Sequence, residues 1–296
     1  MANHTTPRRG PRLGAHMSIA GGYHCAADAA AALSMDTVQI FTKSNAQWAA
    51  KPLTDDDVAK FRDAVTAAGL TGNCAHASYL INPASGDPAA WDKSLEALVV
   101  EMERADRFGL DGVVLHPGAY TKWPRADGVT RVVAAIDAMH KRLPHCRTQL
   151  WLETTAGQGS CLGHRFEEVA EIVDRTAAPD RIGVCLDTCH LFAAGYDLRT
   201  HDGYEQTIAE LSSTIGLSRV KAVHVNDSKH GLGSRKDRHE HIGEGELGLE
   251  PFRRIVNDPR LAHCSMFLET KKEDRDGVPM DEVNLAVLRG LAEPQL

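Results

Sequence analysis

The sequence predicts an α/β protein that folds as a single-domain (β/α)8 TIM barrel. Short apolar runs rich in Val, Ile and Leu recur along the chain with amphipathic helical patterns between them, as in a parallel sheet covered by helices. Eight such runs can be counted. The length of 296 residues suits one large barrel, since barrels often reach about 250 residues as a single unit. An open doubly wound sheet is the alternative, and it would need a reversal of strand order that a sequence cannot show.

The eight predicted strands are short and follow one another at intervals that leave room for a helix. Most of them end in His, Glu or Asp, which is unusual for residues that close a buried strand. We place the strands at Leu13–His16, Thr37–Phe41, Gly72–His76, Gly112–His116, Gln149–Glu153, Ile182–Asp187, Val220–Val225 and Ser265–Glu269.

Helices are predicted between these strands. Thr54 is a suitable N-cap for a helix over Asp55–Ala68, because its hydroxyl can accept a hydrogen bond from an amide of the first turn. Apolar residues at helical spacing predict a second helix around Phe166–Val173. Gly69 and Gly109 are placed to end two of the helices. The remaining long segment, 226–249, is rich in Gly and charge and is predicted to be a loop.

Composition and termini limit the class of protein. Residues 1–11 lack the apolar segment of a signal peptide, so we expect a flexible tail over 1–11, a catalytic barrel over 12–296 and a cytoplasmic location. Seven scattered cysteines, an odd number, indicate reduced thiols. A net charge of −7 argues against a protein that coats nucleic acid nonspecifically, although a local contact remains compatible with it.

Nine residues that can bind a metal lie at or beyond the ends of the predicted strands. Because the carboxyl ends of barrel strands meet at one mouth, these side chains should converge on a single site. His and carboxylate donors are the ligands of catalytic zinc. The nine are His76, His116, Glu153, Asp187, His190, His224, Asp237, His239 and Glu269.

The spacing within the set is suitable for several ions. Glu153 could bridge two of them, since a carboxylate offers two oxygens. Asp187 and His190 are three apart at a strand-to-helix turn and could face different ions. Asp237 and His239 are two apart in an extended segment, so they point the same way. Five histidines and four carboxylates would leave three divalent ions with a charge of about +2, which suits an anionic phosphodiester.

Each residue alone also has a plainer interpretation. A single histidine near a strand end is usually a surface or core residue, and Asp187 could merely cap the next helix. The set carries more weight, because six consecutive strands ending in metal-capable residues would be costly without a metal. Cys185 and Cys189 are interpreted as structural thiols. His16 could orient a ligand or simply pack in the core.

Two further patterns leave alternatives. His241 is an alternative to His239 as a ligand. Gly243, Gly245 and Gly248 satisfy the G-x-G-x-x-G spacing of a dinucleotide site, but they follow a loop and not a strand, and the glutamates between them would repel a pyrophosphate. We therefore do not interpret these glycines as a nucleotide-binding site.

The chain resembles endonuclease IV, a family of metal-dependent apurinic/apyrimidinic endonucleases of base-excision repair. The resemblance extends from Leu13 to about Lys271. Its motifs are GAHMSIAGG from Gly14, QIFTKS from Gln39, HASYLIN from His76, LHPG from Leu115, LETTAGQG from Leu152, GVCLDTCHLFAAGYD from Gly183, HVNDSK from His224, DRHEHIGEGELG from Asp237 and FLET from Phe267.

The resemblance implies a DNA-repair hydrolase that cuts the phosphodiester 5′ to an abasic site, leaves a 3′-hydroxyl and cleans blocked 3′ ends. It also implies three Zn²⁺ ions, with one site open to Mn²⁺ or Fe²⁺, and a monomer that associates with the nucleoid when it binds DNA. The catalytic residues would be Glu153, Glu269 and His116. The implied ligand sets are His76, His116 and Glu153 for the first ion, Glu153, Asp187, His224 and Glu269 for the second, and His190, Asp237 and His239 for the third.

The resemblance also implies DNA contacts. Tyr79 and Leu80 match a wedge that fills the gap left by a flipped nucleotide, and a pair of rim residues is the plainer interpretation. The family can place an arginine in the loop after QIFTKS, where this chain has Ala46. Weaker DNA binding is the hypothesis that this departure raises. Further expected DNA contacts are Lys43, Gln47, Lys229 and Arg238.

Two other functions compete with this one. A sugar isomerase or epimerase of the same barrel type would use Glu153, Asp187, His224 and Glu269 around one or two ions, but it would leave the third ligand set without a role. A noncatalytic binder of damaged DNA is disfavoured, because no ligand of the set is missing.

Overall fold

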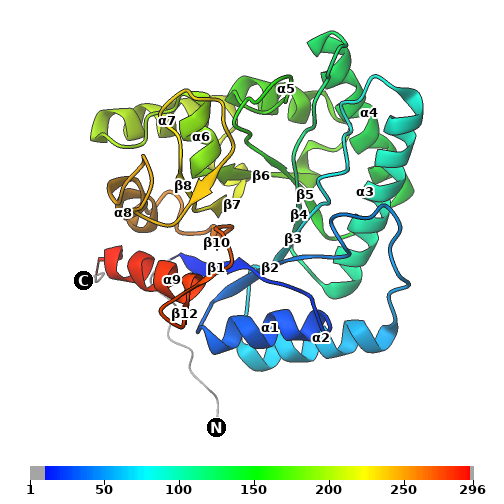
Figure 1. The fold of residues 1–296 in the computed structure, drawn as a ribbon. Helices are drawn as coiled ribbons and strands as arrows, with labels where there is room; N and C mark the ends of the chain where they lie inside the picture. Colours follow the sequence, from blue (N-terminus) through cyan, green and yellow to red (C-terminus); the bar gives the residue numbers. More distant parts are fainter. Residues whose placement is uncertain (1–10, 294–296) are drawn as a thin grey trace.

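The computed structural model describes residues 11–293, which form a closed barrel of eight parallel strands (Figure 1). The predicted (β/α)8 barrel is thus confirmed. The strands lie in chain order around the barrel, and β10 closes it between β7 and β1. They are β1 (Arg12–His16), β2 (Thr37–Phe41), β3 (Cys74–His76), β4 (Gly112–Leu115), β5 (Gln149–Glu153), β6 (Ile182–Asp187), β7 (Val220–His224) and β10 (Ser265–Leu268).

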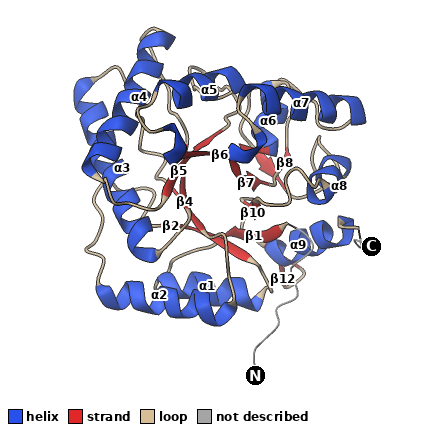
Figure 2. Ribbon diagram, turned by 180° about the vertical axis from the view of Figure 1, so that it is seen from behind, coloured by secondary structure: helices blue, strands red, loops and turns tan. Residues whose placement is uncertain are grey.

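Helices form a ring outside the barrel (Figure 2). None of the helices within residues 11–293 has the length and apolar character that a membrane span requires. The predicted tail, 1–11, lies outside the described residues except for Pro11. The helices are α1 (Tyr23–Ala32), α2 (Asp55–Ala68), α3 (Pro88–Phe108), α4 (Arg125–Arg142), α5 (Phe166–Arg175), α6 (Thr188–Ala194), α7 (His201–Thr214), α8 (Glu250–Asn257) and α9 (Met280–Leu291).

The helix boundaries follow from local sequence. The Thr54 hydroxyl accepts a hydrogen bond from the Asp57 amide at 3.1 Å, and the Asp57 carboxylate accepts one from the Thr54 amide at 3.1 Å. This reciprocal capping box starts α2 at the predicted residue. Gly69 and Gly109 follow α2 and α3 with φ values of 66° and 76°, a left-handed conformation that glycine adopts without strain.

Residues 226–249, which were predicted to be a loop, also include two short strands. They contain β8 (Asp227–Ser228) and β9 (His239–Glu240), which pair antiparallel. Two more short strands, β11 (Asp274–Arg275) and β12 (Val278–Pro279), form a hairpin before α9. Single 3₁₀ turns, Pro179–Arg181 and Leu217–Arg219, precede β6 and β7.

The barrel interior has two layers that matter for the site. The lower layer is an apolar cluster of buried residues, and on each of the six strands concerned the metal-capable residue comes two positions later. Alternate residues of a strand face the same side, so the polar layer lies directly above the apolar one. Trp151 fills the lower layer between Gly112 and Gly183, where a Cβ would lie within 2.6 Å of its ring. The lower layer consists of Cys74, Val114, Trp151, Cys185, Ala222 and Phe267.

Candidate metal centre

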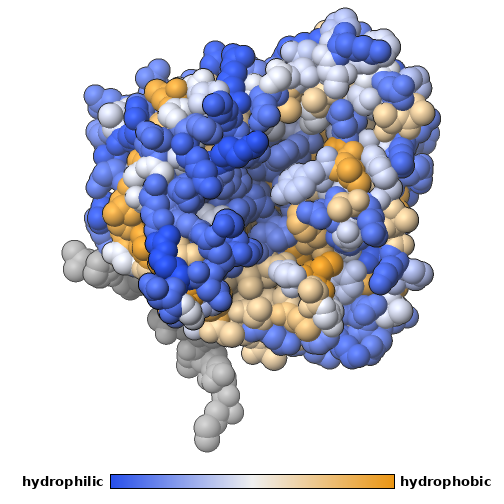
Figure 3. Space-filling view, viewed as in Figure 1, coloured by the Kyte–Doolittle hydropathy of each residue, from blue (hydrophilic) through white to orange (hydrophobic). Residues whose placement is uncertain are grey.

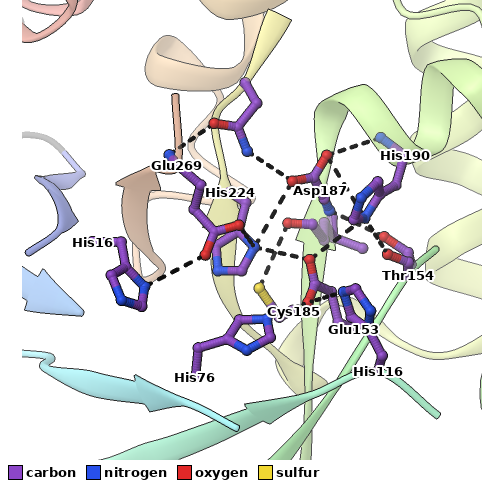
Figure 4. A network of polar contacts seen from close by, with 12 residues as sticks. His16, His76, His116, Glu153, Thr154, Cys185, Asp187, His190, His224 and Glu269 are labelled. Atoms are coloured by element: carbon purple, nitrogen blue, oxygen red, sulfur yellow. Dashed lines mark hydrogen bonds and ion pairs between the residues drawn. The ribbon is translucent and has the colours of Figure 1, made fainter. Parts of the chain in front are cut away.

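The strand ends bring side chains from separate parts of the chain into one cluster at the mouth of the barrel (Figure 4). His76, Glu153, Asp187 and His224 are the last residues of β3, β5, β6 and β7. The register places Asp187 directly beside His224. His116 and Glu269 immediately follow β4 and β10, so they reach the same mouth.

The first group consists of His76, His116 and Glu153, whose candidate ligand atoms all lie within 4.8 Å of one another. The Oε2 atom of Glu153 lies 3.0 Å from Nε2 of His76 and 2.9 Å from Nε2 of His116. The His76 Nδ1–H donates to the Ala77 carbonyl at 2.7 Å, which leaves the Nε2 lone pair facing the group. A neutral imidazole with this tautomer is what a metal ligand needs.

The second group consists of Glu153, Asp187, His224 and Glu269. Nδ1 of His224 lies 2.9 Å from Oε1 of Glu153 and 3.2 Å from Oε2 of Glu269. Each oxygen of Glu153 therefore faces a different group. Burial opposes ionisation of Glu153, but the neighbouring His116 and His224 hold its pKa well below the usual value, so it remains a carboxylate.

The third group involves His190, Asp237 and His239. Asp237 lies 3.2 Å from Nε2 of His190 through one oxygen and 3.4 Å from Nε2 of His239 through the other. The structure adds Asp187 to this group, with Oδ2 3.6 Å from Nε2 of His239. The other oxygen of Asp187 accepts the His190 amide at 2.8 Å and caps α6. The capping role and the ligand role of Asp187 are thus compatible.

Two buried nitrogens test whether these residues fit metal ions. The His190 Nδ1–H donates to the Thr154 carbonyl at 2.8 Å and the His239 Nδ1–H donates to the Glu269 carbonyl at 3.2 Å, so in a neutral ring the lone pair of each is on Nε2. Both Nε2 atoms are buried and make no hydrogen bond. Unsatisfied buried nitrogens are costly, and a divalent cation would use both. The donor set therefore fits metal ions.

Gln39 is a site residue that the sequence analysis missed. It is fully buried, its Nε2–H donates to Oε1 of Glu269 at 2.5 Å, and its Oε1 accepts from Nε2–H of His224 at 2.9 Å. It thereby fixes the His224 tautomer with Nδ1 toward the carboxylates. The available signal was a polar residue at an inward position of an apolar strand.

Asn226 is a second site residue that the sequence did not predict. Its side-chain amide donates one hydrogen bond and accepts another. Its Nδ2–H donates to Oδ2 of Asp187 at 2.7 Å, and its Oδ1 accepts from the amide of Glu269 at 2.8 Å. It therefore links the carboxylate of Asp187, at the end of β6, to the backbone of Glu269, just after β10. From the sequence alone, Asn226 is only the residue two positions after His224.

The histidines with alternative interpretations lie in different surroundings. Nδ1 of His16 is 3.7 Å from Glu269 and 3.0 Å from the Gln39 amide, so His16 borders the cluster. Burial lowers the pKa of His16, which favours a neutral ring. His241 faces away from the cluster, because its ring nitrogens contact Glu273 at 3.2 Å and Asn284 at 3.0 Å. His241 is therefore not a substitute for His239.

The two cysteines beside Asp187 are buried. Burial raises the pKa of both thiols to about 12, so they are neutral thiols when no metal is near. Cys185 belongs to the apolar lower layer. Cys189 lies close to Asp237 and His239, within 4.8 Å between candidate ligand atoms, and it donates to the Arg238 carbonyl.

The segment with the G-x-G-x-x-G spacing donates backbone hydrogen bonds to a buried carboxylate of the protein itself. Asp227 accepts hydrogen bonds from the amides of Ser228, Gly243, Gly245 and Leu247 at 2.7 to 3.0 Å. A Cβ on Gly245 would lie 2.4 Å from the Ser228 carbonyl oxygen, which explains why glycine is needed there. The amides of Gly243 and Gly245 thus help to fix the segment 226–249, which carries Asp237 and His239.

The rim residues divide into exposed and buried ones. Tyr79 is 61% exposed and its ring lies 5.2 Å from that of His76, so it projects from the rim above the first group. Leu80 beside it is half-buried, whereas Gln47 and Arg238 are exposed. Lys229 is exposed enough to reach a phosphate, although its Nζ lies 3.7 Å from Glu240.

The position of Lys43 contradicts its predicted contact with DNA. It was expected to contact a phosphate, but it is only 4% exposed, and its ammonium lies 3.4 Å from Oε1 of Glu101. It also donates to the Gln47 carbonyl at 2.8 Å. With its charge paired and its donors used inside the protein, Lys43 is not placed to reach DNA.

A cavity of about 490 Å³ lies beside the first and third groups. Its lining includes His116, His190, Asp237 and Tyr79. Figure 3 looks onto the same face as Figure 1 and shows a hydrophilic hollow near its centre. Of the cluster, His116 and Asp237 line this cavity and are partly exposed, so they can be reached from outside.

Comparisons with known proteins agree with this architecture. The family model described as "Xylose isomerase-like TIM barrel" matches residues 27–290. "Probable endonuclease 4" of Trichlorobacter lovleyi is 48% identical over 279 residues, covering 94% of this chain and 99% of that protein. The crystal structure of endonuclease IV from Thermus thermophilus is 38% identical with a TM-score of 0.85, covering 95% of this chain and 98% of that one.

A more distant likeness concerns the fold alone. A D-tagatose 3-epimerase-like protein has a TM-score of 0.71 at 17% identity, covering 95% of this chain and 96% of that one. The barrel is thus shared beyond the nucleases, whereas sequence identity across nearly the whole length points to one group. The chain belongs to the endonuclease IV family of the xylose isomerase-like TIM barrels.

Proposed function

We propose that this endonuclease cleaves double-stranded DNA at the phosphodiester 5′ to an abasic site, leaving a 3′-hydroxyl, and that it also removes blocked 3′ ends. We expect residues 12–296 to act as one catalytic domain, as a monomer in the cytoplasm. The observation that carries the proposal is that the candidate ligand groups share members: Glu153 belongs to the first and second groups, and Asp187 belongs to the second group and to a set with His190 and His239. Linked ions are suited to a phosphodiester, whose charge and leaving oxygen both need stabilisation.

Three Zn²⁺ ions are the proposed cofactors, with one site open to Mn²⁺ or Fe²⁺. His76, His116 and Glu153 would hold the first, Glu153, Asp187, His224 and Glu269 the second, and His190, Asp237 and His239 the third. When bound, the ions would activate water and stabilise negative charge on the phosphate.

The chain's own residues prepare the ligands for this role. Backbone carbonyls of Ala77 and Thr154 hold His76 and His190 in the tautomer whose Nε2 is free to bind. His224 is held in the other tautomer, because Oε1 of Gln39 accepts its Nε2–H and leaves Nδ1 free to bind. Glu153, Glu269 and His116 are the proposed catalytic residues, because they surround the space where the scissile phosphate would meet the ions.

DNA binding is proposed for the rim around the cluster. Tyr79 and Leu80 would enter the gap left by the abasic nucleotide, and the exposure of Tyr79 supports this role. Lys229 and Arg238 would contact phosphates, and Gln47 would reach the minor groove. The cavity beside Tyr79 would receive the displaced sugar, since unstacking costs least where no base is present.

Incision of an end-labelled duplex with one abasic-site analogue tests the proposal. We expect a single nick 5′ to the lesion, with a 3′ end that a polymerase can extend. The nick should disappear after prolonged chelation and return when zinc is added. Failure of metal-replete protein to nick this duplex would reject the proposal. Activity on a ketohexose in the same preparation would then favour an epimerase.

A further inference from the structure

A buried polar network lies behind the rim loops, outside the candidate metal centre. It is centred on Glu101 of α3, which is 1% exposed. The Glu101 carboxylate lies 3.4 Å from the ammonium of Lys43 and accepts a hydrogen bond from the Thr42 hydroxyl. Removing two charges from water is expensive, and a buried ion pair often contributes little net stability. The pair therefore needs an explanation other than stability.

The network connects two loops that approach the proposed DNA surface. The loop after β2 contains Lys43, whose ammonium donates to the Gln47 carbonyl at 2.8 Å and so holds this part of the loop from inside. The loop after β3 contains Ser78, whose amide donates to Oε1 of Glu101 at 3.3 Å. The Ser78 hydroxyl donates to the Asn45 carbonyl at 2.7 Å and joins the loops directly.

The base of the first loop is anchored by Arg104, one turn further along α3. Its guanidinium donates to the carbonyls of Thr42 at 2.8 Å and Lys51 at 2.9 Å, and to the Tyr23 hydroxyl at 2.6 Å. Arg104 therefore holds both ends of the segment that presents Gln47. One face of α3 thus fixes where this segment lies on the rim. Through Glu101 it also fixes the position of the segment relative to Tyr79.

We propose that Glu101 is a positioning residue for DNA binding, which holds the loops bearing Gln47 and Tyr79 at the separation that a distorted duplex requires. This inference rests on the proposed function. Two side chains that enter the same duplex gain affinity when their spacing is set before binding, because less ordering is needed on contact. Glu101 touches neither DNA nor metal in this account and acts through the loops.

The test compares the steady-state constants for incision with those for a small substrate. Glu101→Gln keeps the shape but leaves Lys43 without its counter-charge. We expect its KM for an abasic duplex to rise about tenfold while kcat stays within about twofold. Hydrolysis of bis(4-nitrophenyl) phosphate, which does not reach the loops, and zinc content should both match the parent.

Two further variants keep the test informative if Glu101→Gln folds poorly. Ser78→Ala removes the hydroxyl link between the loops, together with the acceptor of the Leu80 amide at 3.3 Å, and should raise KM about threefold. Glu101→Gln combined with Lys43→Met removes both charges and should recover part of the KM lost by Glu101→Gln alone. Glu96→Gln is the matched control, because Glu96 is on the same helix but is exposed and pairs with Arg142 at 2.5 Å. Its constants should equal those of the parent.

The outcomes distinguish a failure of this inference from a failure of the proposed function. If the parent nicks the duplex while Glu101→Gln and Ser78→Ala keep the parental KM, the inference is wrong and the function stands. Equal losses on both substrates together with loss of zinc would show a merely structural role and would also reject it. If the parent does not nick abasic DNA at all, the function and the inference fall together.

Discussion

Nδ1 of His224 lies 2.9 Å from Oε1 of Glu153, although both side chains are fully buried. Gln39 occupies Nε2, the other ring nitrogen of His224, so the Nδ1 lone pair is turned toward the carboxylates of Glu153 and Glu269. The second oxygen of Glu153 faces His76 and His116 at 3.0 and 2.9 Å. One carboxylate therefore lies between two groups of nitrogen donors, which is the arrangement of a bridging ligand.

The first prediction concerns this bridge. Glu153→Gln replaces an oxygen by an amide nitrogen that cannot bind a cation, so two ions should be weakened together. We expect bound zinc to fall from about three ions per chain to about one, and incision to fall at least about a hundredfold. Elemental analysis after gel filtration measures the metal. A full complement of zinc in this variant would show that Glu153 is not a bridge.

The second prediction concerns Glu269, which contacts Gln39, His224 and His16. Glu269→Gln should abolish turnover while the fold remains, because the surrounding hydrogen bonds tolerate an amide. Circular dichroism and thermal unfolding check the fold, and the incision assay checks turnover. Cleavage at near the parental rate would mean that the second group has been assigned wrongly.

The third prediction concerns Ala46, which is exposed on the loop after β2. Ala46→Arg should raise affinity for an abasic duplex about threefold at low salt, and the gain should shrink as salt rises, because ions screen the added charge. Ala46→Gln is the control for side-chain length without charge. Equal affinities for the Arg variant and the parent across the salt series would remove the hypothesis that Ala46 weakens binding.

The fourth prediction concerns stability in acid. Both ring nitrogens of His140 on α4 are buried without a partner, and burial, aided by the Arg181 charge, lowers its pKa to about 4. Between pH 6.5 and 4 the unfolded chain therefore binds this proton more readily than the folded one, and stability falls as the pH falls.

His140→Leu should remove this acid-dependent loss, which we expect to be about 2 kcal/mol. Urea unfolding of variant and parent across this pH range gives the difference, in which effects of metal loss common to both cancel. His145→Gln, at an exposed position of the following loop, should leave the pH slope unchanged. An identical slope in His140→Leu would show that His140 is solvated.

The strands and the ligand cluster could be predicted because they depend on short-range patterns. β2, β5 and β6 begin and end at the predicted residues, since apolar β-branched runs bounded by turns specify a buried strand. Parallel strands in a barrel then bring their carboxyl ends together whatever the loops do. That geometry is enough to gather His76, Glu153 and His224.

The features that escaped prediction depend on tertiary contacts. In the sequence Gln39 is an ordinary polar residue. Only the structure shows that His224 and Glu269 flank it. The segment 226–249 folds around the Asp227 carboxylate, and its two-residue strands have no periodicity to detect. Lys43 was misjudged because its partner, Glu101, is 58 residues away in the sequence. A lysine in a loop is normally solvated, and only the packing of α3 reveals otherwise.

The most direct test of the central claim is a zinc titration of exhaustively chelated protein, with bound metal and incision of an abasic duplex followed in the same samples. Three linked ligand groups predict that incision stays low until more than about two ions per chain are bound and reaches its maximum at about three. Full incision at one or two ions per chain would contradict the three-ion account.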